Sequence, residues 1–331
     1  VTVVLCMFFA AVSGSGPATV AAIGSMVIPT MLQKGYSKSF TLALIATAGS
    51  IGVIIPPSIP MVVYGVSTST SISSMFMAGF LPGLMIGGSL ILVSYIYCKK
   101  HGWKGDDYKY SAKEKLAAIW DAKWALINPV IILGGIYAGI FTPTEAAAVA
   151  AVYAFICGVF IYKELDIKQL FGTLGNACNT TGTTMVIIGC ATAFTKILTI
   201  EKIPDAITNG ILNFSDNMIV ILLLINLLLL VVGCFMDTTP AMMVLSPILL
   251  PIALQFGIDP IHFGLIMVVN LAIGFITPPL GINLFVAARV GSSKLETVCS
   301  GIIKFIIVML VDLMLITFIP EISMTLPKLL M

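Results

Sequence analysis

Charged side chains are scarce in this chain of 331 residues, because Asp, Glu, Lys and Arg together make up only 10% of it. Ordinary globular domains carry about 25% charged residues. Hydrophobic residues make up 59% of the chain and the mean hydropathy is +1.09. This composition excludes an ordinary soluble domain and predicts an integral membrane protein in contact with the lipid bilayer. The net charge of +2 gives no indication of a nucleic-acid partner.

The residue patterns of metal sites and of hydrolytic enzymes are also missing. The two histidines, His101 and His262, lie far apart in sequence, and the seven cysteines are scattered without a CxxC pair. Neither a transition-metal site nor a disulfide framework is therefore indicated. No apolar segment offers a Ser-His pair or two matched aspartates, so an intramembrane hydrolase is disfavoured. We expect a protein that is not an enzyme and that has no organic cofactor.

Apolar runs separated by polar breaks predict an all-α membrane fold with two re-entrant hairpins and two interrupted helices. The expected elements are half-spans 1–12 and 18–32 around a break at 13–17, an interrupted helix 40–66, a span 73–98, a polar loop 99–123, spans 124–141, 146–162 and 177–198, an amphipathic stretch 200–216, a second hairpin 217–256 with its break at 236–240, an interrupted helix 263–288 and a final span 299–319.

Two stretches more than two hundred residues apart share one pattern of helix-breaking residues. Each has a polar break that ends in Pro, followed by a Pro-Pro break inside the next apolar run. Five predicted crossings separate the two hairpins, so the hairpins open on opposite sides and the repeats are inverted. Inverted repeats with broken helices recur in secondary transporters. Laying Pro17 on Pro240 also brings Gly35 onto Gly257, Gly52 onto Gly274, and Pro56-Pro57 onto Pro278-Pro279, with a one-residue slip between the breaks.

The distribution of Lys and Arg predicts the orientation, because these residues concentrate in cytoplasmic loops. If the first hairpin opens to the cytoplasm, fourteen of the 17 basic residues lie on that side, and only Lys196, Lys202 and Lys328 lie on the other. Seven of the fourteen fall in the loop 99–123, which we expect to lie along the cytoplasmic headgroups.

Four regions with different roles are expected along the chain. The chain begins at Val1 inside an apolar run, and the segment of roughly 124–217 that precedes the second copy has no counterpart before the first. We therefore expect the first repeat to be truncated at its N-terminus. The predicted regions are 1–72 (transport, repeat 1), 73–216 (scaffold and arm), 217–298 (transport, repeat 2) and 299–331 (final span and tail).

The breaks predict a site for an ion and an organic acid. Irregular backbone at membrane depth persists only where it is buried in protein or lines a water-filled cavity. Half-helix N-termini suit a carboxylate, and free carbonyl oxygens at C-terminal ends suit Na⁺. With at most one carboxylate the breaks are too weakly charged for a Ca²⁺ cage. Na⁺ is the expected coupling ion, and H⁺ is the weaker alternative because only Asp237 could titrate there.

Three segments of the chain resemble one family of transport proteins. They are Met7–Gly16, Ile54–Gly65 and Thr142–Ala146, and the resemblance extends through Met236–Pro240 and Ile276–Asn283. These residues resemble the large membrane subunit of TRAP (tripartite ATP-independent periplasmic) transporters, the DctM-like family. The resemblance implies a further N-terminal region in members of that family, which agrees with the truncation that we expect of the first repeat.

The resemblance implies an elevator-type, Na⁺-driven importer in the bacterial inner membrane. Such a protein works with a small DctQ-like membrane subunit and a soluble periplasmic substrate-binding protein, and its substrates are organic acids such as C4-dicarboxylates and sialic acid. Two alternatives remain open. A binding-protein-independent Na⁺/dicarboxylate symporter has a related architecture. A channel is less favoured, because the polar residues are confined to the breaks instead of forming a continuous pore.

The breaks and the resemblance together predict the site residues. Asp237 carries the strongest expectation, because a carboxylate at a membrane break is costly, although it can also cap the following helix. Arg289 could reach a substrate carboxylate or anchor the chain at the cytoplasmic interface. The substrate-binding candidates are Ser13, Ser15, Ser58, Asp237, Asn283 and Arg289. The Na⁺ candidates are Ser13, Gly14, Ser50, Gly52, Pro56, Asp237, Thr238, Thr239, Gly274, Thr277 and Pro278.

Overall fold

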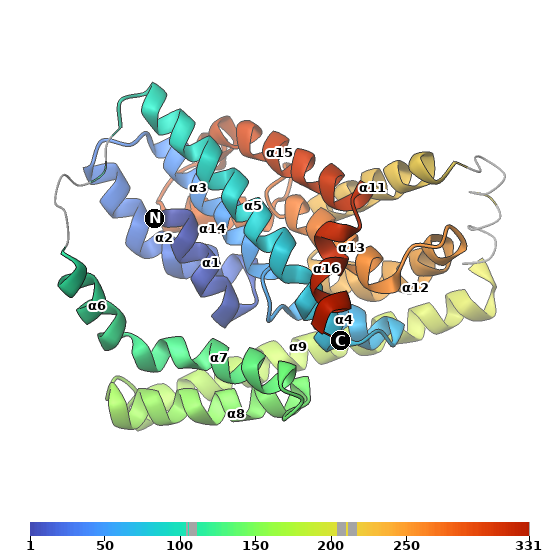
Figure 1. Ribbon diagram of the computed structural model, residues 1–331, viewed down its shortest axis with the longest axis horizontal. Coiled ribbons are helices and arrows are strands. Elements are labelled where there is room, and N and C mark those ends of the chain that lie inside the picture. The colour runs from blue at the N-terminus through green and yellow to red at the C-terminus, as the bar shows by residue number, and fades with distance from the viewer. Residues whose placement is uncertain (104, 106–110, 204–209, 211–216, 331) are drawn as a thin grey trace. The chain divides into compact units, whose positions relative to one another are not determined.

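A computed structural model describes residues 1–103, 105, 111–203, 210 and 217–330, and every regular element in these ranges is a helix (Figure 1). Two compact units are present, one made of Val1–Gly105 with Ala191–Met331 and the other of Asp106–Cys190. The predicted all-helical membrane fold is confirmed. The helices long and apolar enough to cross a membrane are Ile72–Lys100, Pro143–Ile161, Gln169–Ile200, Met218–Phe235, Thr238–Gln255 and Leu295–Phe318.

The first repeat begins with the expected hairpin and continues into an interrupted helix. Both hairpin helices stop at the polar tip, where Gly14 adopts a left-handed conformation with φ of 61° that glycine tolerates without a Cβ penalty. The elements are α1 (Thr2–Ser13), α2 (Gly16–Gln33), α3 (Lys38–Ser50), the single turn η1 (Ile51–Val53), α4 (Ile59–Thr68) and the long helix α5 (Ile72–Lys100).

The second repeat follows the same plan, and a short helix lies after it in the region predicted as the final span and tail. Its interrupted helix breaks after Gly274, and Gly281 is left-handed where the chain re-enters a helix. The elements are α11 (Met218–Phe235), α12 (Thr238–Gln255), α13 (Pro260–Gly274), α14 (Ile282–Val290), α15 (Leu295–Phe318) and α16 (Glu321–Leu330).

The duplication read from the sequence extends to the local structure. Helices α2 and α12 are both 18 residues long, and their starts, 16 and 238, and their ends, 33 and 255, are each 222 residues apart. The glycine after each hairpin, Gly35 or Gly257, has a positive φ. The helix that follows is capped in each case by a side-chain oxygen, from Ser37 in α3 and from Asp259 in α13. Both Pro-Pro bonds are cis.

The two repeats are packed into each other within one unit. Helix α14 of the second repeat lies against α2 and α3 of the first, and α4 of the first lies against α12 of the second (Figure 1). The hydroxyls of Ser67 in α4 and Ser246 in α12 are 2.9 Å apart. The Tyr64 hydroxyl donates to the Pro260 carbonyl at 2.7 Å. Since α13 is buried from His262 to Gly274, the second interrupted helix forms the centre of this unit.

The other unit is built of helices that start at side-chain caps. Thr142 and Glu145 form a reciprocal capping box, with the Glu145 amide donating to the Thr142 hydroxyl and the Thr142 amide donating to the Glu145 carboxylate. The elements are α6 (Ala112–Asp121), α7 (Lys123–Tyr137), α8 (Pro143–Ile156), the turn η2 (Cys157–Ile161) and α9 (Ile167–Ile200), which continues into the first unit.

Some sequence predictions fall partly outside the described residues. In the loop predicted at 99–123, residues 104 and 106–110 are not described, and the last part of that loop is the short helix α6. Of the amphipathic stretch predicted at 200–216, residues 204–209 and 211–216 are not described. The division into transport and scaffold regions concerns motion and stays a prediction.

Candidate functional site

The tip of the first hairpin gathers hydroxyl and carbonyl oxygens around one turn of backbone. The hydroxyls of Ser13 and Thr19 are 3.0 Å apart. The Ser15 carbonyl accepts from the Thr19 hydroxyl at 2.8 Å and from the Ser13 hydroxyl at 3.3 Å. These short side chains can bond to nearby backbone because the helix is interrupted here. The tip is thus an oxygen-rich turn with no charged group of its own.

This first tip is inserted against the first interrupted helix. The Gly14 carbonyl accepts from the amide of Ile59, the first residue of α4, at 3.4 Å. A Cβ added to Gly52 would lie 2.6 Å from the Thr19 hydroxyl oxygen and 2.7 Å from the Ser15 carbonyl oxygen. Glycine at position 52 is therefore required for the approach of the two backbones.

Asn283 of the second repeat lies beside the first tip. A Cβ added to Gly16 would lie 3.3 Å from both the Oδ1 and the Nδ2 of Asn283. The Asn283 Nδ2 donates to the Ala46 carbonyl of α3 at 3.1 Å. Asn283 is fully buried, yet its Oδ1 has no hydrogen-bond partner among the described residues. An unpaired buried oxygen costs about 1–3 kcal/mol, so this atom is the strongest structural indication of a ligand position at the breaks.

The tip of the second hairpin carries Asp237, the one carboxylate of the described breaks, which is exposed although Thr238 beside it is buried. The Asp237 Oδ1 accepts from the Thr238 amide at 2.6 Å and from the Thr238 hydroxyl at 3.3 Å. Asp237 therefore caps α12, where its negative charge also meets the positive end of the helix dipole.

The second break differs from the first in its exposure. Pro278, Pro279 and Leu280 are exposed, whereas Pro56 and Ser58 in the first break are buried. The Thr277 hydroxyl donates to the Ile273 carbonyl at 2.8 Å, one turn back in α13. Gly274 lies against the backbone of Gly233 in α11, which holds the outer arm of the second hairpin close to the break.

The predicted site residues fall into two groups. Ser13, Gly14, Ser15, Gly52 and Asn283 converge at the first tip. The other predicted residues lie outside this convergence. Among them, the Ser50 hydroxyl donates to the Thr47 carbonyl at 2.7 Å and the Ser58 hydroxyl donates to the Val53 carbonyl at 2.6 Å, so both bond to nearby backbone. Arg289 is exposed in the last turn of α14. Residues placed outside the first group are Ser50, Pro56, Ser58, Asp237, Thr238, Thr239, Gly274, Thr277, Pro278 and Arg289.

The sequence reading missed two residues of the converging group. Thr19 is fully buried and joins the oxygens of the first tip, and Phe275 lies against Gly16, where an added Cβ would be 3.2 Å from its ring. The position of Thr19, four residues after Ser15, is the spacing at which a hydroxyl reaches back to a helix carbonyl. Thr19 could have been predicted from that spacing. The contact between Phe275 and Gly16 could not, because it depends on how the two repeats pack together.

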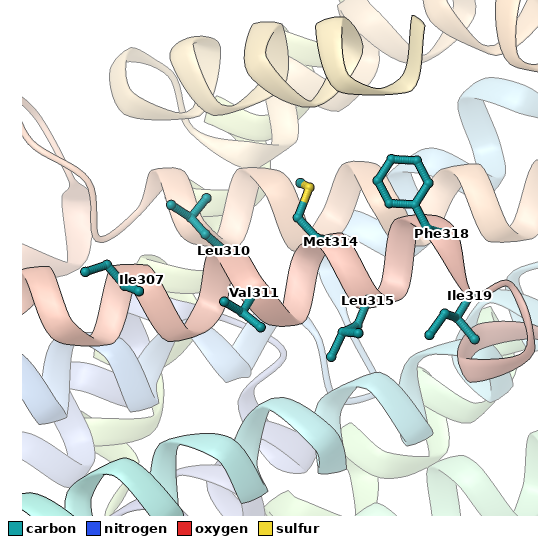
Figure 2. Close-up of a pocket in the computed structure, with 7 residues that line it drawn as sticks. All are labelled: Ile307, Leu310, Val311, Met314, Leu315, Phe318 and Ile319. Atoms are coloured by element: carbon teal, nitrogen blue, oxygen red, sulfur yellow. The ribbon is translucent and has the colours of Figure 1, made fainter. Parts of the chain in front are cut away.

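Two hollows of the structure are apolar and lie elsewhere. One of about 490 Å³ follows α15 and is lined by seven side chains, all of them apolar (Figure 2). Another of about 220 Å³ lies between α11 and α12. Their linings provide no group that would bind an ion or an acid, so we assign neither to the transport site. The side chains in Figure 2 are Ile307, Leu310, Val311, Met314, Leu315, Phe318 and Ile319.

Comparison with known proteins identifies the family. The family described as the DctM component of tripartite ATP-independent periplasmic transporters matches residues 1–322. This chain belongs to the DctM family. As a DctM-family protein it is a multi-pass protein of the bacterial inner membrane that acts in transport and is not an enzyme. The resemblance to the DctM-like family is thereby confirmed over almost the whole length of the chain.

Relatives of this DctM-family chain carry names that refer to different acids. It is 52% identical over 323 residues, 98% of the chain, to the isethionate TRAP transporter permease protein DctMQ of Oleidesulfovibrio alaskensis, and spans 51% of that protein. It is 43% identical to the C4-dicarboxylate large permease DctM of Pseudomonas aeruginosa, covering 98% of this chain and 76% of that one. It is 38% identical to the sialic acid large permease SiaM of Vibrio cholerae, covering 99% and 77%.

Proposed function

We propose that this chain is the large membrane subunit of a Na⁺-coupled importer of an organic acid, which it receives from a periplasmic substrate-binding protein. One observation carries the proposal. The buried, unpaired Oδ1 of Asn283 in the second repeat lies beside the oxygen-rich tip of the first repeat. The break in the first hairpin and the break before α14, both costly in a membrane, therefore meet beside the Asn283 Oδ1, which has no hydrogen-bond partner among the described residues.

The proposed substrate is an anionic organic acid. Helices α2, α4 and α14 begin at the breaks without a side-chain cap. Their first amides and the positive ends of their dipoles favour a bound anion. The relatives are named for isethionate, C4-dicarboxylates, sialic acid and 2,3-diketo-L-gulonate. These compounds all carry an acidic group, and the differences among them leave the individual substrate of this chain open.

The proposed coupling ion is Na⁺, with ligands from both repeats. The hydroxyls of Ser13 and Thr19 and the Ser15 carbonyl provide neutral oxygens within 3.3 Å of one another. Asp237 provides the charge in the other repeat. Oxygen ligands with one carboxylate suit a monovalent cation better than Ca²⁺, which takes 6–8 oxygen ligands that usually include several carboxylates. The remaining proposed ligands are Gly14, Ser50, Gly52, Pro56, Thr238, Thr239, Gly274, Thr277 and Pro278.

The proposed mechanism moves the two hairpins and two interrupted helices together as an elevator. The interlocking of α14 with α2 and α3, and of α4 with α12, supports this part of the proposal, since elements packed this way would move as one body. The proposed partners are a small DctQ-like membrane subunit and the binding protein. The name DctMQ of the Oleidesulfovibrio alaskensis relative supports the proposal of a small DctQ-like subunit.

Uptake measured in proteoliposomes tests the proposal. The permease is reconstituted with its small subunit and offered labelled acid bound to the binding protein, with or without an inward Na⁺ gradient. We expect saturable uptake that requires both the gradient and the binding protein. Equal uptake without Na⁺ would rule out sodium coupling.

The same assay separates the alternatives. Strong Na⁺-driven uptake of free acid without the binding protein would favour an independent symporter. Uptake that rises linearly with concentration and does not saturate would favour a channel. Loss of acid uptake when a proton ionophore collapses the H⁺ gradient, with the Na⁺ gradient held constant, would indicate H⁺ as the coupling ion.

A further inference from the structure

One end of the first unit carries a dense group of lysines around an aromatic cluster. Four elements meet there, namely the turn after α2, the start of α3, the end of α5 and the first half of α15. We name this surface the basic face. The Lys38 ammonium donates to the Ser292 carbonyl at 3.0 Å, and the hydroxyls of Ser39 and Ser300 are 2.8 Å apart. Its lysines are Lys34, Lys38, Lys99, Lys100, Lys294 and Lys304.

Lys304 occupies an unusual position within the basic face. Its ammonium lies 3.3 Å from the centroid of the Tyr97 ring, 5.0 Å from that of Phe40 and 5.6 Å from that of Phe305. Cation–π attraction of this kind is worth about 0.5–2 kcal/mol, but it leaves N–H donors without an acceptor. In the part of the chain that the structure describes, no carboxylate lies within ion-pair distance of Lys304.

Aromatic rings flank this ammonium on several sides. Tyr36 and Trp103 have ring centroids 5.3 Å apart, and Phe40 and Tyr97 are stacked at 5.0 Å. His101 stacks on Trp103 at 5.0 Å. Aromatic rings of this kind concentrate at the level of lipid headgroups. The cluster lies at the ends of apolar helices, so a ligand of the basic face would have both its charge and its apolar part accommodated.

Among the described residues, the charge of the basic face is almost entirely of one sign. The described parts of its segments carry six lysines, and Glu296 at the start of α15 is the acidic residue among them. Each Lys near an anionic membrane surface contributes about 1 kcal/mol of attraction. A soluble anion would use the charge but not the surrounding aromatic and apolar surface. We propose that the basic face binds the phosphodiester of an anionic phospholipid such as phosphatidylglycerol, with Lys304 and Lys38 as its principal contacts.

Quenching of Trp103 fluorescence by brominated lipid tests this proposal. The protein has three tryptophans, so Trp120→Phe with Trp124→Phe leaves Trp103 as the sole emitter. The protein is placed in bilayers containing brominated phosphatidylglycerol or brominated phosphatidylcholine. We expect phosphatidylglycerol to bind at least about fivefold more tightly beside Trp103, the ratio that corresponds to about 1 kcal/mol.

Substitutions then separate specific binding from general attraction. Lys304→Gln with Lys38→Gln should reduce the preference to about equal binding, whereas Lys328→Gln in α16 should leave it unchanged. Lys304→Arg keeps the charge and should keep the preference. If the double variant does not fold, Lys38→Gln alone should still lower the preference.

Three outcomes would overturn the proposal. They are equal quenching by the two lipids in the starting protein, a preference that survives Lys304→Gln with Lys38→Gln, and loss of the preference when inorganic phosphate is added at constant ionic strength. The last outcome would identify the ligand as a soluble phosphate. None of these outcomes depends on Na⁺-coupled uptake, so the test is independent of the proposed function.

Discussion

The two hairpin tips share one backbone plan but lie in different surroundings. The first tip has Gly14 and Gly16 buried, and it packs against its own interrupted helix and against Asn283. At the second tip Asp237 is exposed, as are Pro278 and its neighbours in the second break. Equivalent positions in the two repeats thus have different surroundings. The first tip presents tightly packed neutral oxygens, and the second presents an exposed carboxylate.

This difference predicts that the two tips respond to different kinds of substitution. Added volume should be harmful at the first tip, where backbones are in contact. Loss of charge should be harmful at the second tip, where there is room but only one carboxylate. The predictions below test this contrast, beginning with the largest expected effect.

Removal of the charge at the second tip should have the largest effect on transport. We expect Asp237→Ala to abolish Na⁺-coupled uptake in proteoliposomes, because the proposed Na⁺ site loses its only carboxylate. Its cost in stability should be small, about 0.5–2 kcal/mol for a lost N-cap. Asp237→Asn should keep the cap but still lose coupling.

Asp259→Ala is the matched control for this change. Asp259 caps α13 in the same way, by accepting from the Ile261 amide at 2.8 Å. This variant should lose a similar amount of stability and keep its Na⁺ dependence. Wild-type coupling in Asp237→Ala would remove Asp237 from the mechanism and leave it only a capping role.

Added volume at the first break should have the next largest effect. In Gly52→Ala the new Cβ would meet Thr19 and the Ser15 carbonyl at 2.6 and 2.7 Å. We expect a loss of about 1–3 kcal/mol in stability, as in other overpacked sites, and at least a tenfold fall in uptake. Thermal unfolding and initial uptake rates measure the two effects.

A second glycine provides the comparison for Gly52. A Cβ added to Gly88 in α5 would meet nothing within 4 Å, so Gly88→Ala should preserve both uptake and stability. Equal behaviour of the two alanine variants would show that the close approach at Gly52 does not matter for transport.

Loss of the amide between the repeats should have an intermediate effect. We expect Asn283→Leu to raise the KM for the transported acid several-fold, because its unpaired Oδ1 faces the proposed ligand position. Asn226→Leu is the control, since Asn226 is also buried and donates to the Thr317 hydroxyl at 3.1 Å. It should lower stability with little change in KM. The same KM shift in both variants would argue for a general packing effect.

Thiol labelling should show the smallest effect, a difference in accessibility. In a variant without its seven cysteines, Met236→Cys should react with a soluble maleimide several times faster than Thr19→Cys. Met236 is 41% exposed and Thr19 is fully buried. Na⁺ together with the acid should slow the reaction at position 236. Labelling at equal rates would contradict the contrast between the tips.

The fold could be predicted from the sequence largely because a membrane makes helix interruptions conspicuous. The break at Ser13–Pro17 and the one at Asp237 were placed correctly, since polar residues with Gly and Pro stand out in apolar runs. Helix ends were placed within a few residues for most spans. Helix α9 begins ten residues earlier than expected, because polar residues such as Asn176 and Asn179 obscured its periodicity.

The surroundings of the site could not be predicted in the same way. Repeat symmetry gives equivalent positions in the chain but not their burial, which depends on the contacts between elements distant in sequence. The sequence predicts Ser13 and Asp237 as ligands of one site but does not give their surroundings, and these differ: the tip at Ser13 packs against Gly52 and Asn283, whereas Asp237 is exposed. Thr19 was overlooked because it lies two residues beyond the break.

A density map of the reconstituted transporter with Na⁺ and its acid bound tests the account most directly. We predict that the acid contacts the side chain of Asn283 and the turn from Ser13 to Pro17, with Na⁺ held by oxygens of the interrupted backbone. An acid bound instead in the apolar hollow along α15, or at the membrane surface away from both tips, would contradict the account.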